Sequence, residues 1–300
     1  MPRNDLKKLE TTIRNIKEAS FKTDNRLEEK INKIKDAFIT NWKVENISFI
    51  NNIINSIDIN KGIPLPVLSI CGKGTQEIRF TKYLAYFLSP NGKHGLQDKF
   101  LKALLNPECR QLGLASNWSE NCEVISEIKL GDIQGKGKTI SCFGDIGIVG
   151  EDYIIVIEQK ILSDESRHPD TELNQLQRYN IALDNNFKYS NRKQIKIYLT
   201  PEKAHEKDIH GWLALTHSDI IDRGLKLLKS GNISKVGKEN LLRLLIDLAT
   251  GPYESLENSL DEIIYLGNKL VSEEFNLERV FRFNRLVGEN RQIIKILLEG

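Results

Sequence analysis

The sequence has no long apolar run, no closely spaced cysteine pairs and no excess of one charge. Its most apolar stretches are short, such as Tyr153–Ile157, whereas a membrane-spanning helix needs about 20 such residues. The charged beginning of the chain is not followed by an apolar segment, so we expect no secretory signal. The four cysteines show no Cys-x-x-Cys spacing, which argues against a zinc ribbon and a disulfide framework and favours a reducing cytoplasm. Lys and Arg outnumber Asp and Glu by only 43 to 41, so any affinity for nucleic acid has to come from a local basic surface.

What the sequence does contain is ordinary for a globular protein. Hydrophobic residues make up 40% and charged residues 28% of the 300 residues, which excludes global disorder and a fibrous repeat. A chain of this length can bury a large core, in one large domain or two ordinary ones. The changes in periodicity predict a helical arm over residues 1–60, a core over residues 61–235 and a helical C-terminal region over residues 236–300.

Apolar residues in the first sixty positions recur at steps of three and four, which is typical of amphipathic helices. They fall on two segments separated by the polar stretch 22–25: Leu6, Leu9, Ile13 and Ile16 on the first, and Leu27, Ile31, Ile34 and Phe38 on the second. Such stripes have to be buried against each other, against the main domain or against another chain. We therefore expect either an arm that binds a second copy or a partner protein, or a helical layer on the core.

The core region alternates between helical and strand patterns. Helical periodicity predicts helices over residues 75–88 and 96–105, over a segment capped by Asp170 that ends near Leu183, over a segment capped by Ser218, and over most of the chain from Lys238 onward. β-Branched runs predict strands over residues 123–130, 139–149, 153–161, 194–199 and 212–216. This order predicts an α/β core with helices as its outer layers.

Three charged residues lie on the two strands that flank Gly150. Glu158 and Lys160 are two apart, so their side chains project from the same face. If the turn between these strands holds two residues, the residue numbers of each cross-strand pair add up to 303. Asp145 then lies opposite Glu158, with their Cβ atoms about 5 Å apart. Two carboxylates at this distance repel each other unless a cation lies between them, and Mg²⁺ takes oxygen ligands. A lysine beside such a metal can orient an attacking water, so the pattern predicts metal-dependent hydrolysis of a phosphate ester.

The same residues also fit a solvated charged edge of a sheet. The context favours a site, because residues 154–157 are apolar on both faces of the strand, and charges at the end of a buried strand are costly unless they face a polar cleft. Two further groups belong to neighbouring helices. Gln175 and Tyr179 lie four apart on one helix face, and Glu77 places a carboxylate on the apolar stripe of another helix. Both groups also have a plain structural explanation, as a core tyrosine and as a solvated helix end.

With these residues the chain resembles the PD-(D/E)XK nuclease superfamily over about residues 75–228. The residues that carry the resemblance are Asp145, Glu158, Lys160, Gln175 and Tyr179. The last two are similar to the Gln-x-x-x-Tyr element of RecB-like members, which implies that they support the site or guide the nucleic-acid strand. The stretch 76–94 is similar to the opening of bacterial nuclease-family proteins of this superfamily. Gly144 stands where the eponymous motif has proline, and no chemistry depends on that proline.

The resemblance implies a restriction-endonuclease-like fold, with a central mixed sheet flanked by helices, an N-terminal helical arm and a helical C-terminus. It implies a metal site made by Asp145, Glu158 and Glu77, the last as the acidic residue of the first core helix. It also implies that Lys160 positions the attacking water.

We therefore expect a Mg²⁺-dependent nuclease, with Mn²⁺ able to substitute, that hydrolyses phosphodiester bonds of DNA in anti-phage defence. Two alternatives stay open: a DNA repair or recombination nuclease, and a non-catalytic nucleic-acid-binding scaffold that keeps the fold. Because Asp145, Glu158 and Lys160 are all present, the sequence favours an enzyme.

Overall fold

The computed structural model of the chain describes residues 11–12, 25–57, 66–73, 76–161, 169–201, 209–250, 256–272 and 275–300. Its centre is a five-stranded sheet in which the spatial order of the strands equals their order in the sequence. The strands are β1 (Glu123–Gln134), β2 (Thr139–Val149), β3 (Tyr153–Gln159), β4 (Lys193–Thr200) and β5 (Leu213–Thr216). The first three strands pair antiparallel and the last three pair parallel, so the predicted mixed sheet is confirmed.

The register of the β2–β3 hairpin agrees with the predicted sum of 303. Ile146 pairs with Ile157 and Val149 with Ile154, and the main-chain N–H of Gly150 donates to the carbonyl of Tyr153 at 3.1 Å. The turn therefore holds two residues, as an even alternation requires. The next position along each strand is Asp145 on β2 and Glu158 on β3, which places both on one face of the sheet.

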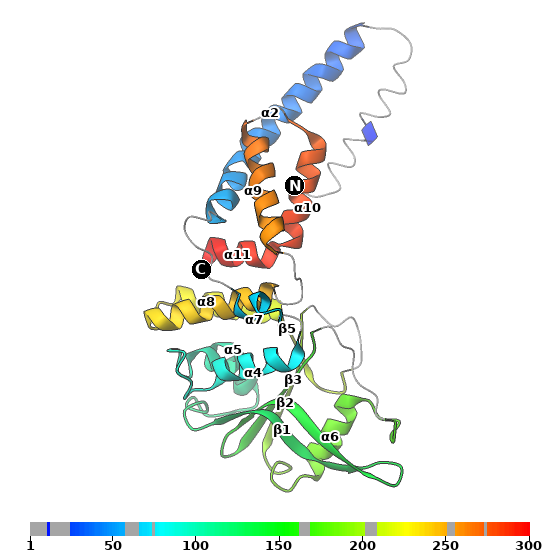
Figure 1. Cartoon of the computed structure of the whole chain (residues 1–300), viewed down its shortest axis with the longest axis vertical. Helices are drawn as coiled ribbons and strands as arrows, with labels where there is room; N and C mark the ends of the chain where they lie inside the picture. Colours follow the sequence, from blue (N-terminus) through cyan, green and yellow to red (C-terminus); the bar gives the residue numbers. More distant parts are fainter. Residues whose placement is uncertain are drawn as a thin grey trace.

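Every residue of β3 is buried, because helices cover both faces of the sheet. Ile154 and Val156 belong to an apolar cluster with α6 (Gln175–Asn185), whereas Ile155 and Ile157 belong to a larger cluster on the opposite face. The larger cluster includes α4 (Glu77–Leu88), α5 (Lys99–Gln111), α7 (His217–Lys229) and α8 (Lys235–Thr250). Figure 1 shows these layers stacked along the long axis of the molecule, with α6 on the opposite side of the sheet from α4 and α5.

Strand β1 continues to Gln134, past the predicted end at Leu130. The continuation depends on a bulge between Lys129 and Gly131, after which β1 and β2 pair again. Gly131 lies against α6 so closely that a Cβ atom there would be 2.5 Å from the carbonyl oxygen of Ala182. Only glycine permits this close approach. The bulge depends on a contact between distant parts of the chain, so the local sequence pattern did not predict it.

Both predicted helix caps in the second half of the core were wrong. Helix α6 is capped by Asn174 instead of Asp170, and α7 is capped by Thr216 instead of Ser218. In each case the residue three positions after the cap bonds back to it, Gln177 to Asn174 and Asp219 to Thr216. This reciprocal pair of hydrogen bonds satisfies two main-chain N–H donors. A single Asp or Ser without a partner three positions later satisfies only one.

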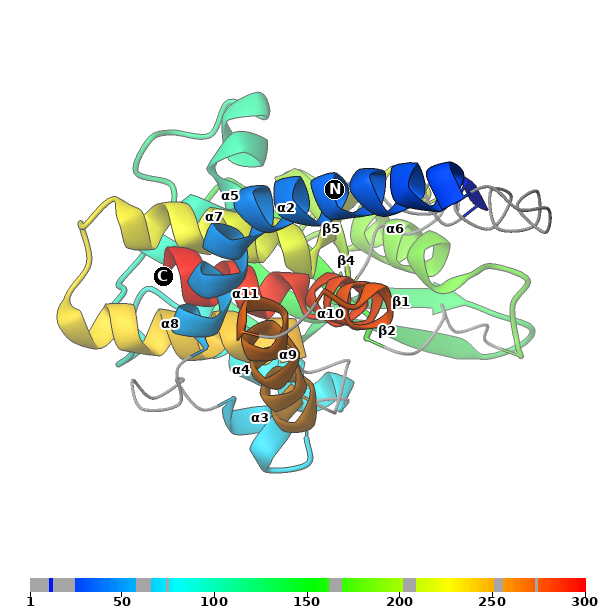
Figure 2. The same ribbon diagram turned by 90° about the horizontal axis from the view of Figure 1, so that it is seen from above.

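The N-terminal and C-terminal helices form the far end of the molecule. They are α2 (Asn25–Ser56), α9 (Leu256–Ser272), α10 (Leu277–Glu289) and α11 (Arg291–Glu299). The short α3 (Val67–Ile70) lies instead against α8, where the main-chain N–H of Leu68 donates to the carboxylate of Asp247. Helix α2 packs on α9 and α11, and its N-terminal part extends past α9 (Figure 2). No helix in the described part of the chain is both long and apolar enough to cross a membrane.

The predicted second helix of the arm belongs to α2. Phe38 and Trp42 meet the ring of Phe275 at 6.2 and 5.2 Å between centroids, so this part of the arm is a layer on the helical end of the molecule. Ile34, nearer the start of α2, is 62% exposed. The predicted first helix, with Leu6, Leu9, Ile13 and Ile16, and the side chain of Leu27 lie outside the described residues.

Candidate active site

The predicted acidic pair lies at the C-terminal end of β3. Glu158 is 1% exposed, and Asp145 on β2 is partly buried. The main-chain N–H of Gln159 donates to Oδ2 of Asp145 at 2.7 Å, which fixes this carboxyl group beside the end of β3. The antiparallel hairpin thus brings together two acids that are 13 positions apart in the sequence.

Lys160 joins the acid of β3 to an acid of α4. Its Nζ lies 2.7 Å from Oε1 of Glu158 and 3.2 Å from Oε1 of Glu77. The other carboxylate oxygen of Glu77 accepts a hydrogen bond from the main-chain N–H of Ile161 at 3.3 Å. The strand presents Lys160 on the α6 face, and α4 covers the opposite face. Glu77 reaches Lys160 because it stands in the first turn of α4, beside the end of β3.

The two polar residues of α6 also belong to this cluster. The amide Nε2 of Gln175 lies 2.6 Å from Oε1 of Glu158 and 2.7 Å from the hydroxyl oxygen of Tyr179. The capping box at Asn174 starts α6 so that Gln175 is its first residue, and the helical spacing then places Tyr179 one turn later on the same side. Five of the six residues proposed for the site from the sequence are therefore in one hydrogen-bonded group, and the sixth, Asp145, is held beside them by the main-chain N–H of Gln159.

Burial and the repulsion from neighbouring acids make the carboxyl groups of Asp145 and Glu158 hard to ionise. Burial, with a contribution from Asp145, raises the pKa of Glu158 to about 8, although Lys160 opposes this. Burial also raises the pKa of Asp145, against the hydrogen bond from Gln159. Burial lowers the pKa of Lys160, but the carboxylates around it outweigh that effect and hold the pKa above its usual range. Three acids lie around one ammonium group, so a further cation would reduce the repulsion between the acids.

The donor atoms at this cluster fit a magnesium ion that keeps part of its water shell. Oε2 of Glu158 is buried and has no hydrogen-bond partner among the described residues, and the facing Asp145 supplies a second carboxylate. The described part of the chain contains no group of three His, Cys, Asp or Glu residues that could hold a metal ion. Mg²⁺ is usually bound by one or two carboxylates together with water and substrate phosphates, so two acids suffice.

Gln159 is a residue of the site that reasoning from the sequence did not single out. Its side chain is fully buried, and neither amide atom has a hydrogen-bond partner among the described residues. Its main-chain N–H holds Asp145. The sequence does contain a signal for Gln159. It lies between Glu158 and Lys160, so its side chain projects from the other face of the buried strand, which is apolar. Burying an unpaired amide there costs free energy.

Comparison with known proteins agrees with this geometry. The family model described as the PD-(D/E)XK nuclease superfamily matches residues 66–246, from α3 through most of α8. A comparison with curated proteins and one with solved structures each gave no match. The family match includes the whole sheet and all six residues of the cluster, and it spans more than half of the chain. The chain therefore belongs to the PD-(D/E)XK nuclease superfamily, whose members are generally nucleases.

Proposed function

We propose that the protein is a divalent-metal-dependent nuclease that hydrolyses phosphodiester bonds of DNA. The observation that carries the proposal is the buried pair of Asp145 and Glu158, with Lys160 bonded to Glu158 at 2.7 Å. A structural ion pair would need one acid for one base, whereas here Asp145 faces Glu158 and forms no ion pair of its own with any described residue. This excess of carboxylate is what a cation site requires.

Asp145 and Glu158 would hold the ion, with Glu77 as the third acid near it. A bound Mg²⁺ or Mn²⁺ would stabilise the negative charge that develops on the scissile phosphate. Lys160 is the group that we assign to the attacking water, because its ammonium group carries three N–H donors and can hold a water oxygen in place. In hydrolysis that oxygen forms a bond to phosphorus, and the bond from phosphorus to the leaving oxygen breaks.

Gln175 and Tyr179 have a supporting role in this proposal. Gln175 donates to the same oxygen of Glu158 that accepts from Lys160, which leaves Oε2 available to a metal ion. Tyr179 in turn fixes the Gln175 amide at 2.7 Å. Two donors on one oxygen and none on the other orient the carboxylate for binding through its free oxygen.

The proposal is tested by incubating the wild-type protein with plasmid DNA and with RNA in the presence of Mg²⁺, Mn²⁺ or EDTA. We expect cleavage of DNA with either metal and none in EDTA, and loss of cleavage in Glu158→Gln. Glu123→Gln, an exposed acid at the start of β1, is the matched control. A wild-type protein that binds DNA and cuts neither nucleic acid with either metal would establish the non-catalytic scaffold instead.

The setting that we propose is anti-phage defence, supported by the similarity of residues 76–94 to bacterial nuclease-family proteins. Phage plaque counts on cells that express wild type or Glu158→Gln test this setting. Fewer plaques with the wild type alone would support it. Equal plaque counts combined with sensitivity of the Glu158→Gln cells to DNA damage would establish the repair nuclease.

A further inference from the structure

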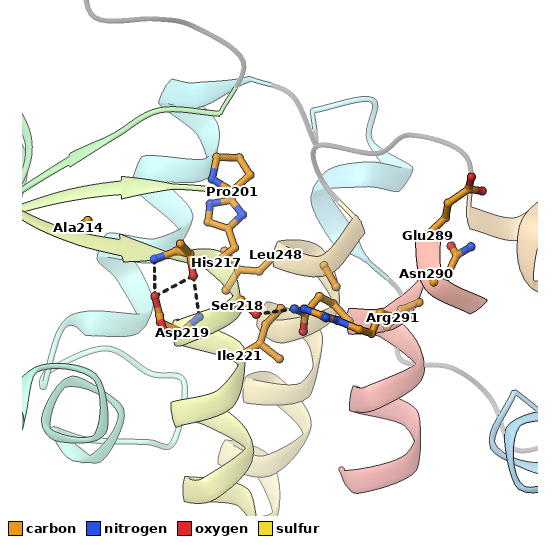
Figure 3. Close-up of a pocket in the computed structure, with 15 residues that line it drawn as sticks. Pro201, Ala214, His217, Ser218, Asp219, Ile221, Leu248, Glu289, Asn290 and Arg291 are labelled. Atoms are coloured by element: carbon orange, nitrogen blue, oxygen red, sulfur yellow. Dashed lines mark hydrogen bonds between the residues drawn. The ribbon is translucent and has the colours of Figure 1, made fainter. Parts of the chain in front are cut away.

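A pocket of about 770 Å³ lies at the same edge of the sheet as the acidic cluster, but it is separate from it. It is lined by Pro201 directly after β4, the end of β5, the N-termini of α7 and α11, and the C-terminal ends of α8 and α10 (Figure 3). None of the acids of the cluster lines it. Its volume falls in the range of pockets that bind small organic ligands, about 300 to 1,000 Å³.

The strand pairing relates the pocket to the acidic cluster. The main-chain N–H of Lys160 donates to the carbonyl of Leu199, and the next residue, Thr200, pairs with Thr216 in the wall of the pocket. Two strand spacings, about 10 Å in all, therefore separate the main chain at Lys160 from the pocket. One strand of DNA rises about 3.4 Å per nucleotide, so about three nucleotides span this distance.

One wall of the pocket contains a buried histidine with no hydrogen-bond partner. His217 is 3% exposed, and neither ring nitrogen has a partner among the described residues. Its ring stacks on Phe80 at 5.8 Å, which fixes its orientation. Burial lowers the pKa of His217 to about 4, against a smaller opposing effect of the Leu248 carbonyl. The imidazole is therefore neutral near pH 7 and offers one donor and one acceptor.

The opposite wall contains the N-terminus of α11. The side chain of its cap residue Asn290 donates to the carbonyl of Leu286 and makes no capping hydrogen bond. The first main-chain N–H groups of α11 therefore have no side-chain acceptor there, and they lie beside the exposed Arg291. Gln292 donates to Ser218, and its Oε1 has no partner among the described residues.

The acids near the pocket have partners of their own. Asp219 accepts hydrogen bonds from the main chain and hydroxyl of Thr216 in the capping box. Glu289 forms an ion pair with Arg285 at 3.6 Å. The walls between the polar ends are apolar and include Pro201, Leu248 and Ile293. The apolar walls, with the imidazole and the amide between them, fit a planar base. The helix N-terminus and the arginine at one end of the pocket fit a phosphate joined to that base.

We propose that this pocket binds a nucleotide, with the base in the apolar slot next to His217 and Gln292 and the phosphate at Arg291 and the N-terminus of α11. The nucleotide belongs to the strand that is cut, about three nucleotides from the scissile bond. This source of the nucleotide rests on the proposed nuclease function, whereas the chemistry of the pocket does not.

The test uses two variants of the full chain and one control. Ala214→Trp fills the pocket from an exposed position on β5, and Arg291→Gln removes the positive charge. Arg110→Gln removes an exposed charge at the end of α5, away from the pocket lining. Binding of fluorescent DNA oligonucleotides is measured in EDTA, binding of a deoxynucleoside monophosphate by calorimetry, and cleavage of the oligonucleotides in Mg²⁺.

We expect Ala214→Trp to weaken binding of a long oligonucleotide tenfold or more, Arg291→Gln threefold or more, and Arg110→Gln less than twofold. An oligonucleotide that ends before the third nucleotide from the cut should bind wild type and Ala214→Trp equally. If Ala214→Trp binds and cuts long and short oligonucleotides like the wild type, the pocket assignment is overturned and the nuclease function stands.

A different result separates the two sources of the nucleotide. If the wild type neither binds nor cuts oligonucleotides but binds the monophosphate, and Ala214→Trp loses that binding, the pocket chemistry is supported with a free nucleotide as its source. In that case the proposed nuclease function fails on its own. If the wild type binds neither form, the pocket proposal is overturned.

Discussion

Glu77 and Lys160 are 83 positions apart in the sequence, and their side chains meet at 3.2 Å. Lys160 also bonds Glu158 at 2.7 Å, so one ammonium group connects the first core helix to the central strand. The chemistry proposed for the cluster depends on this connection, because two acids fix Lys160, whereas Asp145 is held by the main-chain N–H of Gln159. The individual roles can be separated by substitution.

Removing either acid of the facing pair should abolish cleavage and spare the fold. We expect Asp145→Asn and Glu158→Gln each to lower the cleavage rate by at least about 100-fold, because the ion loses one of its two carboxylates. The measurement is initial cleavage rate in Mg²⁺, with circular dichroism to check folding. Asp184→Asn, an exposed acid on α6, is the control for Asp145. Cleavage by Asp145→Asn at the rate of the control would remove the assignment.

Metal binding should stabilise the folded protein in a way that depends on Asp145. At 100 times its dissociation constant an ion adds about 2.7 kcal/mol to the free energy of unfolding, or roughly 5 °C in Tm. We expect this shift with Mn²⁺ in the wild type and little of it in Asp145→Asn. An equal shift in both proteins would mean that the ion binds elsewhere.

Lys160 should affect the rate more than the affinity for metal. We expect Lys160→Met to lower the cleavage rate about 100-fold, since the water loses the group that positions it. The dissociation constant of Mn²⁺, measured by calorimetry, should change only a few-fold. Lys226→Met, on the exposed side of α7, controls for the loss of a lysine. A large loss of Mn²⁺ affinity with an unchanged rate would assign Lys160 to the metal site instead.

The stability of the metal-free protein should fall as the pH rises. The pKa of Glu158 is about 8 in the folded protein and near 4.3 in an unfolded chain. Between these values the folded state binds more protons than the unfolded state, so the free energy of unfolding decreases with rising pH. In EDTA, the Tm of the wild type should therefore fall more steeply from about pH 5 to about pH 8 than that of Glu158→Gln. Parallel curves would contradict the raised pKa.

We propose that a second copy of the chain, or a partner protein, binds the exposed apolar residues of α2. Val44 is 77% and Ile34 62% exposed on this helix. The double substitution Ile34→Lys and Val44→Lys should reduce the mass in light scattering and leave the Tm unchanged, because neither residue is in the core. A monomer mass both before and after would exclude the second copy and leave a partner protein or a helical layer of its own domain.

Removing the whole arm should be more damaging than such a surface change. Trp42, Ile50 and Ile53 of α2 are at most 4% exposed and belong to the same apolar cluster as α4 and α5. Deleting residues 1–58 exposes the partners of these side chains, so we expect a lower Tm in addition to any change in mass. The stability readout distinguishes this deletion from the substitutions on the exposed face.

Local patterns were sufficient to predict the part of the site that lies on the hairpin. The two-residue turn and the alternation of residues along β2 and β3 fix the register, and the register sets Asp145 opposite Glu158. The position of Glu77 is not a local property, because α4 is fixed by packing on the sheet. Its place near Lys160 was inferred from the family resemblance alone. The roles of all these residues stay predictions.

Features that depend on several distant elements could not be read from the sequence. The bulge at Gly131 depends on the close approach of Ala182, and the pocket around His217 depends on β5 and four helices that meet at one edge of the sheet. The two helix caps could have been predicted from the sequence, because Asn174-x-x-Gln177 and Thr216-x-x-Asp219 have the spacing of a capping box. The wrong choice fell on an Asp and a Ser that lack such a partner three positions later.

The equality of spatial and sequence order in the sheet has a consequence during synthesis. A ribosome makes the chain from the N-terminus, and all six residues of the acidic cluster precede Asn185, the last residue of α6. The helices α9 and α11, which pack on α2, are made afterwards. So are α7 and α8, which line the proposed nucleotide pocket together with α11. The chemical groups of the nuclease are thus translated before the helices that support the arm and enclose the pocket, so a truncated product that ends after β4 retains the acids and lacks the pocket.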